Sequence, residues 1–361
     1  MTTSKGRTGE TVRRGRRWTS ALGAAAVAVG LSGAASAQDL LPVKFSLDWA
    51  FQGPQAPFLL ALERGYFEEE GLDVTMDRGY GSGDVPVKVA AGTYDIGVAD
   101  INPTIRLNAE SPDSDLIAVA VLLDASPLAA MTLAGNGIDE PADLEGKILA
   151  APDFDAGRQL FPAFAQATGI DEDLIEWMTV TPQLRETMLA TGDADAITGF
   201  LTSGIQSLKA AGIAEEDIVV MRYPDYGVDL YSTSIITTQT WAAENPEAVT
   251  GIIRAVVRGH LDAIADPDAA IAALKARDPL IDEAIERERM LLSFNALMLT
   301  DHVLENGFSA VDPTRMQEAI DMVKLSYGVD RPMTVEDVYD PAYLPPREDL
   351  QLPDDITVPV M

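Results

Sequence analysis

The sequence predicts an α/β protein made of two lobes with a ligand cleft between them. Short apolar segments with the length of strands alternate with longer segments whose apolar residues recur at helical spacing. Some strand segments, such as LIAVAVLL at 116–123, are apolar throughout, as expected where helices cover both faces of a parallel sheet. A chain of 361 residues also exceeds the usual size of a single hydrophobic core, which favours two lobes.

The first 37 residues have the features of a secretory signal peptide. Four arginines between residues 13 and 17 precede the apolar run ALGAAAVAVGL at 21–31, and the sequence Ala-Ser-Ala follows at 35–37. The apolar run is too short to span a bilayer, and the small residues are typical of a cleavage site. We therefore expect cleavage after about Ala37 and a periplasmic protein. The arginine pairs leave both Sec and twin-arginine export open.

The composition excludes several classes of function. The chain contains no cysteine, so it has no disulfide, thiolate metal site, cysteine nucleophile or lipidated N-terminal cysteine. Its net charge is −31, and removal of 1–37, which holds six basic residues and one acidic residue, makes it −36. Such a surface repels nucleic acid and anionic membranes. The two histidines, His260 and His302, are expected at the surface or at helix ends, and no catalytic, metal or cofactor site is predicted.

The first lobe is predicted to begin with alternating strands and helices. Between 57 and 72, the residues Phe58, Leu62 and Tyr66 recur at helical spacing, and Gly71 is typical of a helix end. The predicted strands are 43–49, 72–81, 93–100 and 116–126, and the predicted helices are 57–72, 85–92 and 102–110.

A second α/β series follows from about Pro141, and the pattern becomes mostly helical from Trp241. In the second series the predicted strands are 176–180, 194–200 and 217–223, and the predicted helices are 156–169, 182–192 and 203–212. We expect the chain to cross between the lobes near 126–133 and 231–238. The first lobe then comprises 38–130 and 235–340, the second lobe comprises 131–234, and the proline-rich tail at 341–361 is expected to be irregular.

Polar and aromatic residues stand at the ends of four predicted strands of the first lobe. They are Asp48 with Trp49, Tyr80 with Ser82, Asp100 with Asn102, and Asp124 with Ser126. Ligands of open parallel sheets bind outside the carboxyl ends of the strands, so these groups together indicate a binding cleft. Each aspartate, Asp100 above all, could instead cap the next helix. The segment GYGSGD at 79–84 is both a flexible turn and a candidate set of backbone N–H groups facing a ligand.

The second lobe offers matching candidates, namely Asp155, Phe200 and Tyr226, and Gln52 in the loop after Trp49 completes the predicted set. Aromatic side chains on such loops commonly stack on flat ligands. The helix start at 153–158 carries two aspartates, whose carboxylates would occupy the N-terminal donors and repel an anion, although Arg158 offsets them in part. The sequence thus favours a neutral or cationic ligand that carries hydrogen-bond donors.

Several segments resemble the NMT1/THI5-like family of substrate-binding proteins. They are DWAFQGPQAPFLLALERGYFEEEGLDV at 48–74, GYGSGD at 79–84, VAAGTYDIGVADIN at 89–102, GDADAITGF at 192–200 and DVYDPAYLPP at 337–346. The resemblance covers nearly all of the chain after the signal peptide. It implies the type II periplasmic-binding-protein fold and a role in an ABC importer for thiamine-pyrimidine precursors, with relatives that bind taurine, alkanesulfonates, nitrate or riboflavin.

The resemblance also implies partners and roles. A monomer would deliver a small nitrogen heterocycle to an ABC permease with its ATPase, with Trp49 stacking on the ring and Asp48 accepting from its N–H groups. The pyrimidine-binding pattern has Pro-Asn and then His-x-Gly where this chain has AFQGPQ at 50–55. A sulfonate, taurine or nitrate receptor therefore stays an alternative. The fungal enzymes of the family need a cysteine-rich motif, and the lack of cysteine favours a protein that is not an enzyme.

Overall fold

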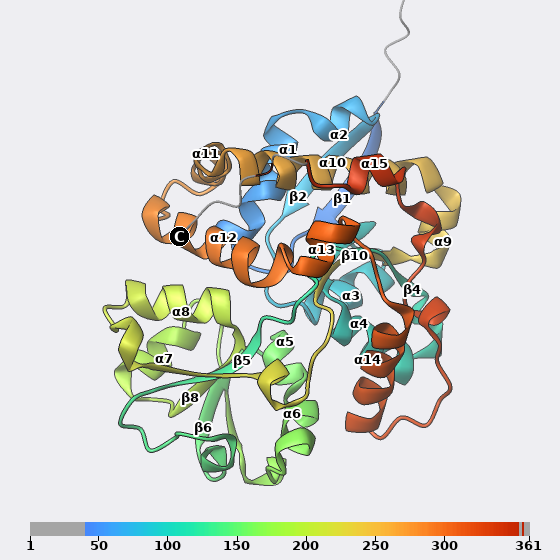
Figure 1. Cartoon of the computed structure of the whole chain (residues 1–361). Helices are drawn as coiled ribbons and strands as arrows, with labels where there is room; N and C mark the ends of the chain where they lie inside the picture. Colours follow the sequence, from blue (N-terminus) through green and yellow to red (C-terminus); the bar gives the residue numbers. More distant parts are fainter. Residues whose placement is uncertain (1–39, 354–355, 357–361) are drawn as a thin grey trace, which may run out of the picture. The chain divides into compact units, whose positions relative to one another are not determined.

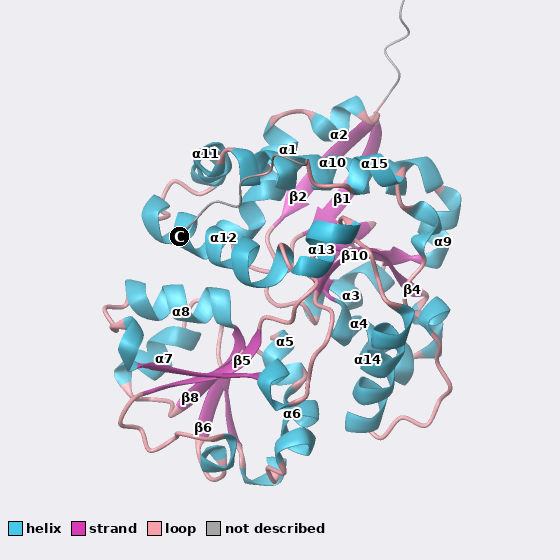
Figure 2. Cartoon of the chain, in the orientation of Figure 1, coloured by secondary structure: helices cyan, strands magenta, loops and turns pink. Residues whose placement is uncertain are grey.

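Two five-stranded sheets form the framework of the protein, each with helices packed on it (Figures 1 and 2). The structure is a computed structural model that describes residues 40–353 and 356. The predicted signal peptide at 1–37 lies outside the described residues, and its cleavage stays a prediction. The mixed α/β architecture with two lobes confirms the fold class predicted from the sequence.

The first sheet has the strand order β2-β1-β3-β10-β4. Its strands are β1 (Leu41–Ser46), β2 (Leu72–Asp77), β3 (Ile96–Asp100), β4 (Leu116–Val121) and β10 (Thr233–Thr238). β1 runs parallel to β2 and β3, whereas β10 runs antiparallel to β3 and β4. Thr233, the first residue of β10, pairs with Asp100, the last residue of β3. The returning chain enters at the carboxyl ends of its neighbours, so the sheet is mixed and not wholly parallel as predicted.

The second sheet has the order β7-β6-β8-β5-β9 and the same kind of reversal. Its strands are β5 (Leu128–Leu133), β6 (Ile148–Ala151), β7 (Glu176–Thr179), β8 (Ala196–Phe200) and β9 (Ile218–Arg222). β5 is antiparallel to β8 and β9 and lies where the sequence predicted only a crossing segment. The chain thus passes between the sheets at 122–127 and at 223–232 (Figure 1). The exact lobe boundaries remain a proposal.

Helices follow most strands and cover the sheets. Those before residue 212 are α1 (Ala56–Glu63), α2 (Tyr66–Glu69), α3 (Asp84–Ala90), α4 (Ile101–Glu110), α5 (Ala156–Gln159), α6 (Phe161–Thr168), α7 (Arg185–Thr191) and α8 (Leu201–Ala210). The helix predicted at 57–72 is divided into α1 and α2, because Gly65 between them adopts a positive φ of 73°, a conformation that ends a right-handed helix.

The rest of the chain is mostly helical, as predicted. It contains α9 (Gln239–Glu244), α10 (Pro246–Ala265), α11 (Pro267–Arg277), α12 (Glu283–Ser293), a π-helix at Phe294–Met298, α13 (Asp301–Asn306), α14 (Pro313–Ser326) and α15 (Arg347–Leu350). The tail predicted to be irregular holds a 3₁₀ turn at Pro341–Tyr343 and then α15. Its order has a cause, because Leu350 is buried in the core that surrounds the first sheet and Arg254 binds Asp349.

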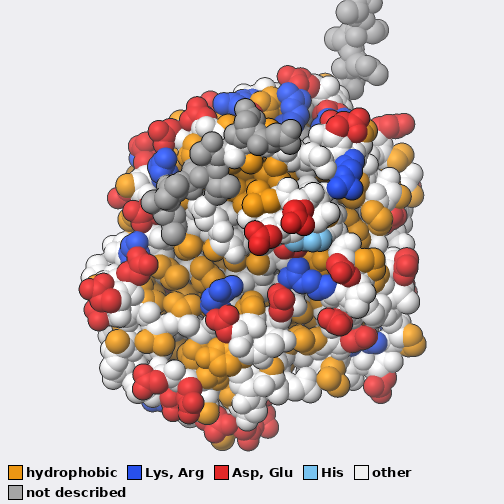
Figure 3. Space-filling model, viewed as in Figure 1, with side chains coloured by type: hydrophobic (Ala, Val, Ile, Leu, Met, Phe, Trp, Pro, Cys, Tyr) orange, Lys and Arg blue, Asp and Glu red, His pale blue; other side chains and the backbone are white. Residues whose placement is uncertain are grey.

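Apolar packing against the sheets holds these elements together. One core cluster joins β1, β2 and the helices α1 and α10, and Phe45, Phe58 and Ile253 are among its buried members. On the face shown in Figure 3, acidic side chains are spread widely, which agrees with the net charge of −31. Of the helices in the described residues, none combines the length and apolar character needed to traverse a bilayer.

Candidate functional site

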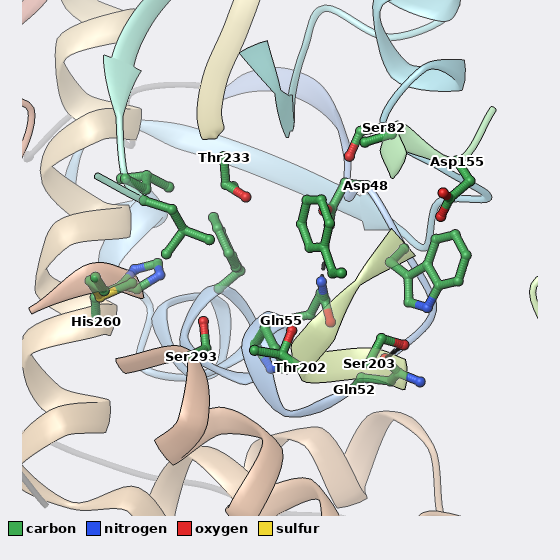
Figure 4. Close-up of a pocket in the computed structure, with 18 of the residues that line it drawn as sticks. Asp48, Gln52, Gln55, Ser82, Asp155, Thr202, Ser203, Thr233, His260 and Ser293 are labelled. Atoms are coloured by element: carbon green, nitrogen blue, oxygen red, sulfur yellow. Dashed lines mark hydrogen bonds between the residues drawn. The ribbon is translucent and has the colours of Figure 1, made fainter. Parts of the chain in front are cut away.

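A cavity lies at the carboxyl ends of the strands, and residues of both sheets line it (Figure 4). Its empty space is about 700 Å³, including solvent at its mouth, which is within the usual size range of small-molecule sites. We call one side the charged end. Its members are Asp48, Trp49, Gln52, Gln55, Asp155 and Arg185. We call the other side the apolar end. Its members are Phe58, Leu122, Leu123, His260 and Met298.

At the charged end, Asp48 and Gln55 form a pair of hydrogen-bond acceptors. Asp48 comes just after β1 and is 5% exposed, and its Oδ1 accepts from Gln55 Nε2 at 3.0 Å. The amide oxygen of Gln55 is buried and has no partner among the described residues. Burial raises the pKa of the Asp48 carboxyl to about 6, although the bond from Gln55 acts in the opposite direction. A ligand with two neighbouring N–H donors would satisfy both oxygens.

Arg185 is the buried cation of the charged end. It is the first residue of α7 and is 1% exposed. Its Nη1 donates to Asp155 Oδ2 at 2.8 Å, and its Nε and Nη2 donate to Glu186 Oε1. The guanidinium carbon lies 5.0 Å from the centre of the Trp49 ring, a cation–π contact that helps to fix the indole. Two carboxylates thus already engage the positive charge that faces the cavity.

A glycine in β8 makes room for this guanidinium. A Cβ atom at Gly199 would lie 2.1 Å from Arg185 Nη1, and the φ of Gly199 is +148°. Only glycine adopts such a backbone conformation readily and leaves the space that Arg185 occupies. Asp155 itself caps α5 by accepting from the N–H of Arg158 at 3.0 Å, which confirms that aspartate occupies this helix start.

The glycine-rich segment at 79–84 does not present its glycine N–H groups to the cavity. Gly79 donates to the carbonyl of Trp49, Gly81 to the carbonyl of Asp48, and Gly83 to the carbonyl of Phe154. The three glycine N–H groups of this segment are therefore already accepted by backbone oxygens, whereas Ser82 of the same segment lines the cavity. That the backbone of the segment contacts a ligand stays a prediction. The glycines instead permit close approach, since a Cβ at Gly81 would lie 2.3 Å from the Phe154 oxygen.

Other contacts join the two lobes around the charged end. Ser203 of α8 donates to Gln52 Oε1 at 2.9 Å. Arg289 of α12 donates to Ser207 of α8 at 3.1 Å and to both oxygens of Glu286. Glu286 in turn accepts from the N–H of Gly53 at 2.6 Å. These bonds connect the loop after β1 with the helices of both lobes, so the charged end is assembled with the lobes in contact.

The apolar end contains a histidine that the sequence analysis placed at the surface. His260 of α10 is 2% exposed, and its ring meets Phe58 edge to face with centroids 4.8 Å apart. Its Nδ1 lies 2.8 Å from the carbonyl oxygen of Val256, one turn earlier. The expectation of a surface or capping histidine is wrong for His260, because α10 packs this face against α1. His302 is exposed, as expected.

The cavity brings together six of the ten residues predicted to bind a ligand. They are Asp48, Trp49, Gln52, Ser82, Asp155 and Phe200. Asp100 lies outside the lining, because Asn102 and Ser232 engage its two carboxyl oxygens at 2.7 to 2.9 Å and it caps α4. Burial also raises the pKa of the Asp100 carboxyl to about 6.

The other three predicted residues lie outside the cavity lining. Tyr80 is 51% exposed. Asp124 accepts from Thr300 and forms an ion pair with Arg315 at 3.1 Å. Tyr226 packs edge to face on the ring of Phe164 within the second lobe. Each of these side chains stands near a strand end, but each turns to a partner outside the cavity lining.

Sequence reasoning missed three lining residues that matter chemically, namely Gln55, Arg185 and His260. A signal existed for Arg185, since it begins a helix that follows a strand and therefore stands at the same edge of the sheet as the other candidates. No local pattern marks His260, whose place depends on how α10 packs. Arg158, the arginine considered for an anion, binds Asp153 and lies over Trp177. In the described ranges, no group of three or more His, Cys, Asp or Glu residues is placed to hold a metal ion.

Two α/β lobes, a chain that crosses twice between them and a cavity where their strands end define the fold of the periplasmic binding proteins. The chain belongs to the NMT1/THI5 like family, whose model matches residues 53–270. This membership confirms the resemblance inferred from the sequence.

Named relatives of the chain differ in function. It is 27% identical over 305 residues to a formylaminopyrimidine-binding protein of Halalkalibacterium halodurans, covering 82% of this chain and 89% of the relative. It is 23% identical over 256 residues to a 4-amino-5-hydroxymethyl-2-methylpyrimidine phosphate synthase of Legionella pneumophila, covering 68% and 78%. The solved alkanesulfonate-binding protein SsuA of Xanthomonas axonopodis, bound to MOPS, gives a TM-score of 0.64 at 15% identity, with coverage of 84% and 99%. The last likeness concerns the fold alone.

Proposed function

We propose that the protein captures a small, flat nitrogen heterocycle in the cavity and delivers it to an ABC importer. The observation that carries this proposal is the acceptor pair of the charged end. Asp48 offers a buried carboxyl, and beside it the amide oxygen of Gln55 is buried without a partner. An unsatisfied buried acceptor costs free energy, so a ligand that donates there is favoured. An amino-substituted ring with adjacent N–H groups has donors in this arrangement.

The aromatic side chains near the acceptor pair support a flat ligand. Trp49 and Phe200 both line the cavity, and the contact with Arg185 orients the indole. Rings of this kind bind flat ligands and exclude water. The name of the relative from Halalkalibacterium halodurans, a formylaminopyrimidine-binding protein, also supports a pyrimidine-like ring.

Closure of the two lobes would link capture to delivery. The charged end draws its residues from both sheets, so a ligand bound there contacts both lobes at once. Such a ligand stabilises the closed form relative to the open form. In this proposal the protein is a periplasmic monomer, and the closed form docks on a permease that works with an ATPase. Membership of a family with many binding proteins supports this role.

Two alternatives make different demands on the site. A sulfonate or nitrate receptor would use Arg185, the arginine in the cavity lining, but Asp155 and Glu186 already neutralise its charge and would repel an anion. A pyrimidine-forming enzyme is suggested by the name of the Legionella pneumophila relative. We favour a binding protein because the sequence contains no cysteine, whereas the family resemblance implies a cysteine-rich motif in the fungal enzymes.

The test is calorimetric titration of the purified protein with 4-amino-5-hydroxymethyl-2-methylpyrimidine, riboflavin, taurine, an alkanesulfonate and nitrate. We expect binding of the pyrimidine, and Asp48→Asn should weaken it by about 10- to 100-fold, because a charge-assisted hydrogen bond is worth about 1.5–3 kcal/mol. Asp124→Asn is the matched control, since Asp124 binds Arg315 outside the cavity lining. Its affinity should equal that of the unmodified protein.

Other outcomes would replace the proposal. Binding of taurine, the alkanesulfonate or nitrate without the heterocycles would support the anion receptor. Appearance of a pyrimidine product during incubation of the protein without added pyrimidine, detected by chromatography, would support the enzyme. Equal loss of affinity in Asp48→Asn and Asp124→Asn would show that the acceptor pair is not the site of recognition.

A further inference from the structure

The apolar end continues the cavity away from the acceptor pair, and it contains His260, whose ring has a nitrogen without a hydrogen-bond partner among the described residues. In Figure 4, His260 lies on the opposite side of the drawn residues from Asp48 and Asp155. Phe58, Leu122, Leu123 and Met298 line the cavity and belong to one buried core cluster. A single six-membered ring bound at Asp48 would leave this space without a ligand group.

The contacts of His260 fix which of its nitrogens carries the proton. A carbonyl oxygen can only accept a hydrogen bond, so Nδ1 donates to Val256, 2.8 Å away. Burial lowers the pKa of the His260 imidazole to about 4, and the ring is neutral near pH 7. In the neutral ring Nε2 is then an acceptor, and no side chain or backbone donor in the described residues binds it.

The walls around His260 restrict what can donate to it. The Phe58 ring meets the imidazole edge to face, and the Phe308 ring lies 6.4 Å from it between centroids, so two aromatic contacts and the bond to Val256 restrict its orientation. The apolar end, as defined above, contains no acidic side chain. A charged ammonium group would lose its hydration here without a counterion, which is costly. A hydroxyl group would lose much less and can donate one hydrogen bond.

We propose that His260 Nε2 accepts a hydrogen bond from a hydroxyl group at the end of a short, uncharged arm of the ligand. The carbon atoms of this arm pack against Phe58, Leu122 and Met298. This inference rests on the proposed function, because it assumes that the ring itself binds at Asp48 and Gln55. His260 is thus a specificity-determining residue, which separates rings with a hydroxyl-terminated arm from rings with a plain alkyl arm.

The experiment compares two probes that differ only in the hydroxyl group, 4-amino-5-hydroxymethyl-2-methylpyrimidine and 4-amino-2,5-dimethylpyrimidine. Titration calorimetry of the unmodified protein should show about tenfold tighter binding of the hydroxymethyl compound, the effect of one buried hydrogen bond. His260→Phe keeps an aromatic ring but removes the acceptor, and it should bind both probes equally. His302→Phe is the matched control and should keep the tenfold preference, since His302 is exposed and its Nε2 bonds to the Ala310 carbonyl.

A second measurement needs no variant and therefore does not depend on folding of His260→Phe. With only two histidines in the chain, ¹⁵N-histidine labelling gives resolvable ring signals. The Nε2 signal of His260 should move in the direction of a stronger hydrogen bond with the hydroxymethyl probe and not with the dimethyl probe.

The results separate the inference from the proposed function. Equal affinities of the two probes for the unmodified protein, or an unchanged Nε2 signal, would overturn the role of His260 and leave the acceptor pair standing. Failure of both probes to bind would overturn the proposed function and this inference together. Loss of the preference in His302→Phe as well as His260→Phe would show a general effect of histidine removal and would overturn the inference.

Discussion

The two ends of the cavity differ in where their walls come from. The charged end combines Asp48, which follows β1 of the first sheet, with Asp155 and Arg185 of the second lobe. The apolar end takes residues such as Phe58 and Leu122 from segments that share one core cluster with the first sheet. The apolar end thus takes its walls from the core around the first sheet, with Leu122 and Leu123 at the start of the crossing segment, whereas the charged end combines residues that follow strands of both sheets.

Under the proposed function, this difference would give the two ends separate tasks. A wall that belongs to one lobe keeps its form whether the lobes are open or closed, so it can recognise the shape of a ligand at first contact. A wall assembled from two lobes gains its contacts only on closure, so it determines how strongly the ligand favours the closed form. Changes at the two ends should accordingly have different consequences for stability and for affinity.

The largest effect is expected from Arg185→Ala at the charged end. Its guanidinium is held by Asp155 and Glu186, and removal would leave these two buried carboxylates without the cation that they bind directly. Breaking a buried ion pair in this way costs about 3–5 kcal/mol in the free energy of unfolding. Urea unfolding followed by circular dichroism measures this loss.

The control for Arg185→Ala is Arg287→Ala. Arg287 pairs with Asp268 at the surface, and both side chains are well exposed. An exposed pair contributes about 0–1 kcal/mol, so this variant should unfold nearly like the unmodified protein. Similar losses of unfolding free energy in both variants would show that the buried ion pairs of Arg185 stabilise the fold no more than an exposed ion pair does.

The second effect is a pH dependence of opposite sign at the two ends. Burial raises the pKa of Asp48 from 3.8 to about 6. As pH rises from about 4 to 6, the unfolded chain loses this proton before the folded protein does, so the ionised carboxyl increasingly destabilises the fold. Asp48→Asn removes this cost. Its free energy of unfolding, relative to the unmodified protein, should rise over this range by at most about 3 kcal/mol and then stay constant.

His260 should behave in the reverse manner. Burial lowers the pKa of its imidazole from 6.5 to about 4. As pH falls from 6.5 towards 4, the unfolded chain gains a proton that the folded protein excludes, which destabilises the fold. His260→Phe should gain stability relative to the unmodified protein as pH falls over this range. Asp100, whose carboxyl pKa burial also raises to about 6, is present in all three proteins. Its charge contributes to the raised pKa of Asp48, so the Asp48→Asn difference includes this coupling, whereas the His260→Phe difference does not.

Urea unfolding at pH 4, 5, 6 and 7 measures both differences. Two curves that slope in opposite directions would support the contrast between a buried carboxyl and a buried neutral imidazole. If neither stability difference changes with pH, water reaches both groups and burial does not shift their pKa values. The two ends would then not differ in protonation.

The fold was predictable because its signals are local. Apolar segments such as β4 indicate buried strands, and helix starts with aspartate or proline mark most helices correctly. The reversals of β5 and β10 were not predictable, since strand direction depends on where the chain re-enters a sheet. The break at Gly65 also escaped, because a glycine within a helical pattern is compatible with either continuation or a turn.

The candidate site was predictable only where position along a strand decides it. Asp48, Asp155 and Phe200 follow or end strands and line the cavity, as the rule for strand ends suggests. Asp124 obeys the same rule but binds Arg315, which stands 191 residues later in the chain. His260 lines the cavity from within the long helix α10, and no local sequence pattern predicts that position. For Asp124 and His260, contacts with residues distant in the sequence determine whether the side chain faces the cavity.

The smallest expected effect is a change in ligand affinity at Gly81, where the two lobes touch beside the charged end. Gly81 follows β2 and has a φ of +144°, and a Cβ there would lie 2.3 Å from the carbonyl oxygen of Phe154 in the second lobe. Gly81→Ala should hold the lobes slightly apart and lengthen the contacts that depend on closure. We expect about tenfold weaker binding of 4-amino-5-hydroxymethyl-2-methylpyrimidine in calorimetry, as for the loss of one hydrogen bond.

Gly92→Ala separates this effect from backbone strain. Gly92 also has a positive φ, +68°, but no atom lies within 4 Å of a Cβ built there. Both variants should lose about 1–2 kcal/mol of stability from the left-handed backbone, and only Gly81→Ala should lose affinity. If Gly92→Ala binds as weakly as Gly81→Ala, strain and not lobe contact governs affinity. If neither variant binds more weakly, the charged end does not need close lobe contact. The two ends would then differ only in the polarity of their side chains.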